Sequence, residues 1–174
     1  MDRDVLRSDV SDWLQFAPIL PVYLMGLSKG KTVNPFWKRT NLLLQSELLM
    51  VAIVRPLKVI TNVSRPENRD NLSMPSGHAA QTFVAATFFH KELGKKSIWY
   101  SIAGYSAAST VGIFRVLSNR HWLGDTLVGA GIGILATNLV YLPRKPRRRK
   151  CPKNTTFIPS VNSNGLGVYL SYKL

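Results

Sequence analysis

Two long, predominantly apolar stretches in the second half of the chain limit the folds that are open to it. Ile98–Leu117 and Trp122–Leu142 have 20 and 21 residues, and four residues separate them. About 20 apolar residues in a helix span the hydrocarbon core of a bilayer. Three shorter apolar stretches come before them: Trp13–Leu27, Leu42–Leu57 and Ala79–Phe89. This order predicts a bundle of about five apolar helices, two of which are long enough to cross a membrane.

The shorter stretches keep a soluble helical bundle open as an alternative. Trp13–Leu27 contains two prolines, and Leu42–Leu57 contains Glu47 and Arg55. The mean hydropathy is +0.01, which is low for a chain that crosses a bilayer several times. Hydropathy alone therefore does not separate the two environments, and the distribution of charge is needed as well.

The basic residues are unevenly distributed. The net charge is +14, but four of the nine acids lie in the first 12 residues and six of the 23 bases in Arg144–Lys150. A nucleic-acid-binding face would carry its charge more evenly, so we expect no nucleic-acid partner. If all five stretches span, Ser28–Asn41, His90–Ser97 and the tail after Leu142 share one face. That face holds 14 Lys and Arg, counted up to Lys153, and the opposite face holds seven. The positive-inside rule places the first face in the cytoplasm.

The length of 174 residues fits one domain with its own core. We expect a single helical membrane domain over residues 1–150 and a short C-terminal tail over residues 151–174. The single cysteine, Cys151, excludes an internal disulfide. No Cys/His cluster has the spacing of a zinc site, and we expect no metal and no cofactor. Gly129 and Gly133, four residues apart in a predicted helix, indicate close helix packing.

Three polar segments come to the face opposite the basic connectors, if the apolar stretches alternate as helices. They are Lys58–Pro66, Pro75–His78 and Phe114–Asp125. Guanidinium groups bind phosphate oxygens through paired N–H donors, and a Lys ammonium adds a compact charge. A turn that opens a helix, as at Ser76, favours anion binding. Fixed donors of this kind stabilise the charge on a phosphoryl group in transfer. The residues that fit this chemistry are Lys58, Arg65, Ser76, His78, Arg115, His121 and Asp125.

The histidines and the carboxylate fit the remaining steps of phosphate transfer. Two histidines can serve as nucleophile and general acid. Asp125 follows His121 by four residues, so in a helix the carboxylate lies one turn away and can hold the imidazole tautomer. Each residue alone also fits a structural role, as a helix cap or an interfacial side chain. The ordered spacing of all of them favours one phosphate site.

In order and spacing, these residues resemble the three signature motifs of the type 2 phosphatidic acid phosphatase (PAP2) superfamily. The resemblance implies an all-helical core and metal-independent hydrolysis of a phosphomonoester or a diphosphate. The family usually has serine where this chain has Phe114, so one phosphate hydrogen bond of the family is not expected here. Its membrane members usually have six spans, against five candidates in this chain. The matching segments are Lys58–six residues–Arg65–Pro66, Pro75–Ser76–Gly77–His78 and Arg115–five residues–His121–three residues–Asp125.

The resemblance also implies a role for each matching residue. It makes His121 the nucleophile that forms a phosphohistidine, with Asp125 as its orienting partner, and it makes His78 the group that protonates the leaving oxygen. The residues implied to bind phosphate are Lys58, Arg65, Ser76, Gly77 and Arg115.

We therefore expect an all-α integral membrane helical bundle in a bacterial inner membrane, with its active site facing the periplasm. The expected function is hydrolysis of a lipid phosphate or diphosphate, with phosphatidic acid, phosphatidylglycerol phosphate, undecaprenyl diphosphate and lipid A phosphate as candidate substrates. The expected partners are this lipid and the bilayer, with no obligatory protein partner. Two alternatives stay open: a soluble acid phosphatase of broad specificity from the same superfamily, and a catalytically silent scaffold that binds a lipid phosphate.

Overall fold

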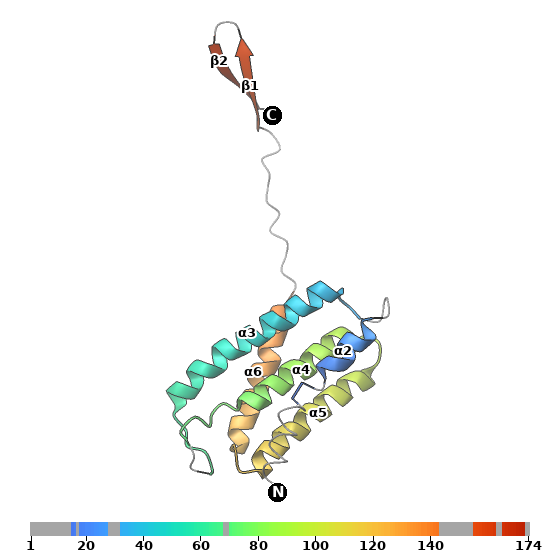
Figure 1. Cartoon of the computed structure of the whole chain (residues 1–174), viewed down its shortest axis with the longest axis vertical. Coiled ribbons are helices and arrows are strands. Elements are labelled where there is room, and N and C mark those ends of the chain that lie inside the picture. The colour runs from blue at the N-terminus through green and yellow to red at the C-terminus, as the bar shows by residue number, and fades with distance from the viewer. Residues whose placement is uncertain are drawn as a thin grey trace. The chain divides into compact units, whose positions relative to one another are not determined.

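The computed structural model describes residues 15–16, 18–27, 32–67 and 70–142, and the backbone of residues 155–162 and 165–172. The chain divides into two compact units, Met1–Leu142 and Pro143–Leu174. The predicted boundary at residue 150, the basic run Arg144–Lys150, Cys151 and the acidic N-terminal segment all lie outside the described residues. The described helices of the first unit are α2 (Ile19–Met25), α3 (Phe36–Thr61), α4 (Gly77–Leu93), α5 (Ile98–Leu117) and α6 (Leu123–Tyr141) (Figure 1).

The described part of the second unit consists of the two strands of a β-hairpin. Its strands, β1 (Thr155–Asn162) and β2 (Gly165–Tyr172), pair antiparallel, with Thr155 opposite Tyr172 and Asn162 opposite Gly165. Alternation of side chains in the tail is typical of a strand, and both strands lie within the predicted C-terminal tail. All described regular structure in the first unit is helical, as predicted.

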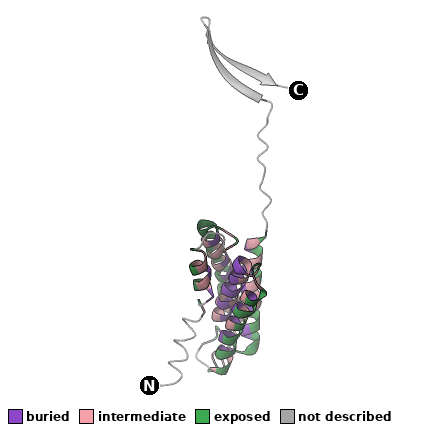
Figure 2. Cartoon of the chain, turned by 90° about the vertical axis from the view of Figure 1, so that its right-hand side faces the viewer, coloured by how far each residue is buried: buried purple, intermediate pink, exposed green. Residues whose placement is uncertain are grey.

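Helix α4 is the central element of the first unit and contacts α2, α3, α5 and α6. Its sequence is apolar or small on nearly every side, which is typical of a helix buried all round. Ser76 caps its N-terminus, with the Oγ accepting the N–H of Ala79 at 3.4 Å. Buried residues consequently run along the inner sides of the helices (Figure 2). The core contains two clusters: Met50, Val54, Ala80, Val84 and Ala136, and Val22, Phe88, Phe89 and Leu93.

Helix α6 packs closely on α4 through two glycines. A Cβ added at Gly129 would clash with the carbonyl oxygen of Ser76, and one added at Gly133 would clash with that of Ala80. The predicted role of this glycine pair in close helix packing is therefore confirmed. The contact holds the first turns of α4 and α6 side by side, and both turns carry predicted site residues.

The end of the bundle away from those turns is closed by buried polar groups. The carboxylate of Glu92 near the C-terminus of α4 accepts the backbone N–H of Asn34 at 3.0 Å, its Nδ2 at 2.7 Å and the Tyr141 hydroxyl at 2.8 Å. The buried Arg39 guanidinium lies 4.8 Å from the centre of the Tyr23 ring. The Glu92 contacts join the segment just before α3 to the ends of α4 and α6, and the Arg39 contact joins the start of α3 to α2. Because α3 and α4 are consecutive, the end of α3 and the start of α4 then lie at the opposite end of the bundle.

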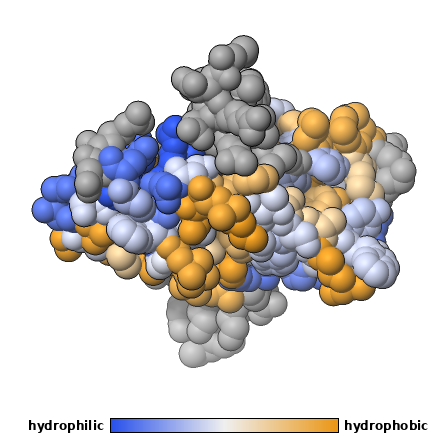
Figure 3. Space-filling view, turned by 90° about the horizontal axis from the view of Figure 1, so that it is seen from below, coloured by the Kyte–Doolittle hydropathy of each residue, from blue (hydrophilic) through white to orange (hydrophobic). Residues whose placement is uncertain are grey.

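Much of the outer surface is apolar, although the core contains buried polar groups. Large exposed apolar side chains follow α3, α5 and α6, and one end of the molecule shows broad apolar patches beside hydrophilic ones (Figure 3). Among the described residues, only α6 is both long and apolar enough by composition to cross a bilayer, with a mean hydropathy of 1.5. Helix α2 has seven residues and is about 10 Å long, so this helix alone is too short for a core of about 30 Å.

Candidate active site

An open cavity of about 570 Å³ lies where α3 ends and α4 begins, beside the loop between α5 and α6. Six of the eight predicted site residues line it, and Ser76 and Asp125 lie buried next to it. No carboxylate is found among the described residues that line the cavity. The polar lining consists of Gln15, Arg55, Lys58, Arg65, Gly77, His78, Gln81, Arg115, Arg120 and His121, and the apolar lining of Phe16, Met50, Val51 and Val54.

Asparagines end the two helices that lead into the site. Helix α3 stops at Asn62, which is in the left-handed region at φ 45°. Asn119, at φ 53°, turns the chain after α5 and directs Arg120 and His121 toward the cavity. Asparagine tolerates this conformation because its short side chain can hydrogen-bond locally. The Trp122 indole N–H donates to the Ser64 carbonyl at 3.0 Å, so the two segments that follow these turns are tied together.

The buried centre of the site consists of His121, Asp125 and Ser73. The His121 Nδ1 lies 3.8 Å from the Asp125 Oδ2 and 3.4 Å from the Ser73 Oγ. The Ser73 hydroxyl donates a short hydrogen bond to the Asp125 Oδ2. The same oxygen accepts the backbone N–H of Trp122 at 3.0 Å. These contacts fix the carboxylate and place one edge of the imidazole against two polar groups.

The first turn of α4 is held against the first turn of α6. The backbone N–H of Ser76 donates to the Asp125 carbonyl at 2.9 Å. Gly77 and His78 follow at the start of the helix and line the cavity. The first N–H groups of a helix have no partner within the helix and favour an anion. The contacts of Ser76 serve to position this turn, and its predicted role in binding phosphate stays a prediction.

Two cations of the site, Lys58 and Arg65, are held by contacts with the segment between α3 and α4. The Lys58 ammonium donates to the Leu72 carbonyl at 2.6 Å, and the Arg65 Nε donates to the Asp70 Oδ1 at 2.8 Å. The N–H of Leu72 also donates to the Asp70 carboxylate at 3.0 Å. This hydrogen bond first, and the Arg65 charge second, lower the pKa of Asp70. Arg115 reaches the cavity from the last turn of α5 and is 4% exposed.

His121 is neutral at pH 7 in this environment. Burial lowers its pKa to about 4, and the positive charges of Lys58, Arg65 and Arg115 act in the same direction. The charge of Asp125 opposes them without reversing the shift. A neutral imidazole keeps a lone pair on one ring nitrogen. The site therefore contains a neutral imidazole with an available lone pair, and cations suited to an anionic substrate surround it.

Sequence reasoning missed three residues at the site. Ser73 is fully buried between His121 and Asp125, although no motif spacing marks it. Arg55 lies three residues before Lys58 on α3 and lines the same cavity; the i,i+3 spacing is a signal that could have found it. Arg120 fits an interfacial role by sequence, and the structure adds it to the cavity.

Comparisons with known proteins agree with this arrangement. The family model of the PAP2 superfamily matches residues 39–149. The lipid A 1-phosphatase of Porphyromonas gingivalis is 47% identical over 93 residues, which are 53% of this chain and 21% of that protein. The lipid A 1-phosphatase of Helicobacter pylori is 28% identical over 76 residues, which are 44% of this chain and 38% of that protein. The matches thus cover about a fifth and about two fifths of these two relatives.

A solved structure has the same fold. The crystal structure of Aquifex aeolicus LpxE matches with a TM-score of 0.62 at 20% identity, over 79% of this chain and 84% of that chain. At this identity the likeness concerns the fold alone. It shows that the helical arrangement around α4 is one that a known protein adopts.

Proposed function

The chain belongs to the PAP2 superfamily, and on that basis we propose that it is an integral membrane phosphatase that removes phosphate from a lipid. The favoured substrate is a lipid A that carries a 1-phosphate. Its support is the likeness to two lipid A 1-phosphatases, one of them 47% identical over 93 residues. Phosphatidic acid, phosphatidylglycerol phosphate and undecaprenyl diphosphate are the competing substrates in the test below.

The observation that carries this proposal is the two-sided character of the cavity. Lys58 and Arg65 lie at its polar end, whereas Met50, Val51 and Phe16 line its apolar part. Lys58 and Met50 are eight residues apart on α3, which is about 12 Å along the helix. A lipid phosphate matches both parts, because its phosphate binds the cations and its hydrocarbon contacts the apolar wall. A small soluble phosphoester would leave that wall without a partner.

The first chemical step is attack by His121 on the phosphorus. Its Nδ1 faces Ser73 and Asp125, so we assign the attack to Nε2. The Nε2 lone pair forms the N–P bond while the P–O bond to the lipid breaks, and His78 donates a proton to the leaving oxygen. Lys58, Arg65, Arg115 and the first N–H groups of α4 stabilise the charge on the phosphoryl oxygens.

The second step releases inorganic phosphate. A water molecule attacks the phosphorus of the phosphohistidine, and the electron pair of the N–P bond returns to Nε2. His78, which lost its proton in the first step, accepts the proton of this water. Asp125 holds the imidazole through both steps and stabilises its positive charge. The enzyme returns to its starting protonation state.

The site faces the periplasm in this proposal, and the protein lies in a bacterial inner membrane. The support is the excess of Lys and Arg in the connectors and tail of the opposite face. A tag at the C-terminus should therefore be protected in intact cells. Labelling of that tag from outside intact cells would contradict the topology without affecting the chemistry.

The function is tested by phosphate release from detergent-purified protein. The panel contains lipid A 1-phosphate, the three competing lipids and a water-soluble phosphoester, each with and without chelator. We expect release from a lipid that survives chelator and is lost in His121→Ala. Preference for the soluble phosphoester would favour the soluble-phosphatase alternative. Binding of the lipids without release from any of them would favour the silent scaffold.

A further inference from the structure

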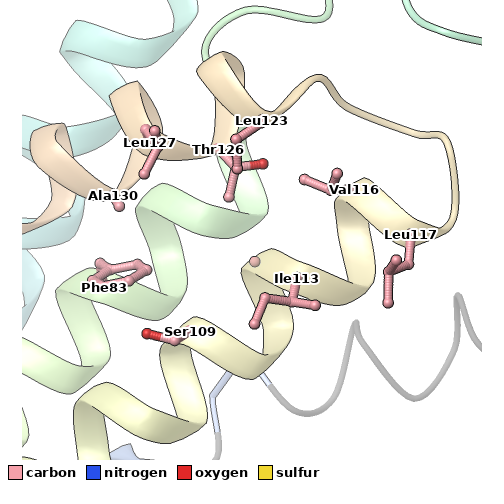
Figure 4. A pocket seen from close by; sticks show the side chains of 10 residues that line it. Phe83, Ser109, Ile113, Val116, Leu117, Leu123, Thr126, Leu127 and Ala130 are labelled. Atoms are coloured by element: carbon pink, nitrogen blue, oxygen red, sulfur yellow. The ribbon is translucent and has the colours of Figure 1, made fainter.

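A second cavity, of about 350 Å³, lies between α5 and α6, and no described residue lines both it and the phosphate cavity. Figure 4 shows its side chains, which come from α4, α5 and α6. Phe83 of α4 contributes to one wall, Ile113 and Leu117 of α5 to a second, and Leu123 and Leu127 of α6 to a third. We call this cavity the α5–α6 groove.

The groove is suited to hydrocarbon. Among the described residues, none that lines it is charged, and the hydroxyl groups in its lining are those of Ser109 and Thr126. The Thr126 hydroxyl donates within its own helix, to the Trp122 carbonyl at 3.4 Å. Ile113 and Leu127 are more than half exposed, so the groove is accessible from the outer surface of the bundle. An empty apolar cavity forfeits dispersion contacts along its walls, and within a bilayer the molecules that can restore them are acyl chains.

The position of the groove defines how a lipid acyl chain would lie in it. Its α5 wall runs from Ser109 to Leu117, which is about 12 Å along the helix. Leu117 and Leu123 lie on either side of the loop that carries His121. The groove thus starts at the level of the active-site loop, and its length is roughly two fifths of a 30 Å hydrocarbon core.

A close contact between α5 and α6 lies in the wall of the groove, next in sequence to residues of the proposed active site. A Cβ added at Gly112 would lie 2.9 Å from the Thr126 Cγ2. Gly112 is three residues before Arg115, and Thr126 directly follows Asp125. Gly112 and Thr126 both line the groove, and neither lines the phosphate cavity. A substrate whose phosphate lies at His121 has the apolar wall of the phosphate cavity for its own hydrocarbon.

We propose that the α5–α6 groove binds one acyl chain of a surrounding bilayer lipid rather than of the substrate. The acyl chain of this lipid packs against α5, which carries Arg115, and against α6, which carries Asp125. It therefore supports the pair of helices on which the active-site loop is mounted. This site is additional to the proposed phosphatase activity, and it can be tested without measuring that activity.

The test is photo-labelling of the full chain in vesicles of phosphatidylethanolamine and phosphatidylglycerol that contain a phospholipid with a diazirine in its acyl chain. Ile113 and Leu127 line the groove, whereas their neighbours Phe114 and Val128 are exposed at the same depth outside it. General contact with lipid would label each residue in proportion to its exposed fraction. This fraction is 57% for Ile113 and 38% for Phe114. We expect an excess at Ile113 and Leu127 beyond that proportion. Labelling in proportion to exposure would overturn the proposal.

The second arm of the test uses a variant in which a larger side chain fills the groove. Ser109→Phe places a ring in the groove, and Ser106→Phe is the matched control, because Ser106 is an exposed serine one turn earlier on α5 that does not line it. Ser109→Phe should abolish the excess labelling at Leu127, and Ser106→Phe should keep it. Persistence of the excess in Ser109→Phe would contradict the proposal. Displacement of the label by an added lipid phosphate, but not by added phosphatidylethanolamine, would show that the occupant is the substrate and would also overturn it.

Discussion

Replacing Ser73 with alanine should slow turnover without weakening substrate binding. The side chain is fully buried and does not line the phosphate cavity. Its hydroxyl donates to the Asp125 Oδ2 and lies 3.4 Å from the His121 Nδ1. In Ser73→Ala, that carboxylate oxygen keeps the Trp122 N–H at 3.0 Å but loses its hydroxyl donor. The imidazole also loses the hydroxyl group beside it.

The size of the effect follows from the hydrogen bond that is removed. A hydrogen bond to a charged group contributes about 1.5–3 kcal/mol. If that support is lost when His121 becomes positively charged in the transition state, kcat should fall about tenfold to a hundredfold. The KM should change little, because Ser73 does not line the cavity in which the substrate binds.

The assay is the initial rate of phosphate release over a range of lipid concentrations, normalised to the amount of folded protein. Ser118→Ala is the control, because Ser118 follows α5 in the loop that carries His121 and does not line the cavity. A purely structural role for Ser73 would lower the unfolding temperature and leave the kcat of the folded fraction unchanged. That result, or a raised KM at unchanged kcat, would refute the positioning role.

Three further predictions concern the nucleophile and the packing beneath it. His121→Ala should abolish phosphate release, whereas Asp125→Asn should lower kcat by up to about 10⁴-fold and leave measurable turnover; equal residual activity in both variants would contradict their roles. The pKa of His121 is about 4 in the folded protein, against an ordinary value of 6.5. Between these pH values the unfolded state binds more protons than the folded state, so the free energy of unfolding should fall as the pH falls from 6.5 to 4. The expected loss is about 3 kcal/mol, at 1.36 kcal/mol per pKa unit. Unfolding in detergent across this range should show a flatter profile for His121→Gln, and identical profiles would contradict the burial of a neutral imidazole. Gly133→Ala should lower the unfolding temperature because its Cβ would clash with the Ala80 carbonyl, whereas Gly131→Ala, with nothing within 4 Å of its Cβ, should be neutral or stabilising because alanine favours helices.

Hydropathy and motif spacing were enough to predict the helical bundle and the family. The last four predicted apolar stretches lie in helices α3 to α6. Long apolar runs in a helical pattern form helices that bury their apolar sides against one another. The first stretch gave only a seven-residue helix in its described part, with Pro18 just before Ile19, in keeping with the preference of proline for helix starts. The PAP2 resemblance was confirmed by the family match over residues 39–149.

The site could be predicted only where its residues lie in the motifs. His121 and Asp125 are four residues apart, so local helix geometry relates them. Ser73 is 52 residues from Asp125, and no local rule pairs residues at that separation. Their contact depends on the glycine-mediated packing of α6 on α4, which sets where the turns meet. The α5–α6 groove likewise depends on how far two helices diverge, and hydropathy does not report this. The roles of the individual site residues stay predictions.

The most direct test of the proposed chemistry is to trap the covalent intermediate. Purified protein is mixed with a lipid carrying radiolabelled phosphate, quenched in alkali within one turnover, digested and mapped by mass spectrometry. We predict an acid-labile, alkali-stable phosphoryl group on the His121 imidazole of the wild type that is absent from His121→Ala. Phosphate release by the wild type without a phosphohistidine, or with the label on another residue, would contradict His121 as the nucleophile.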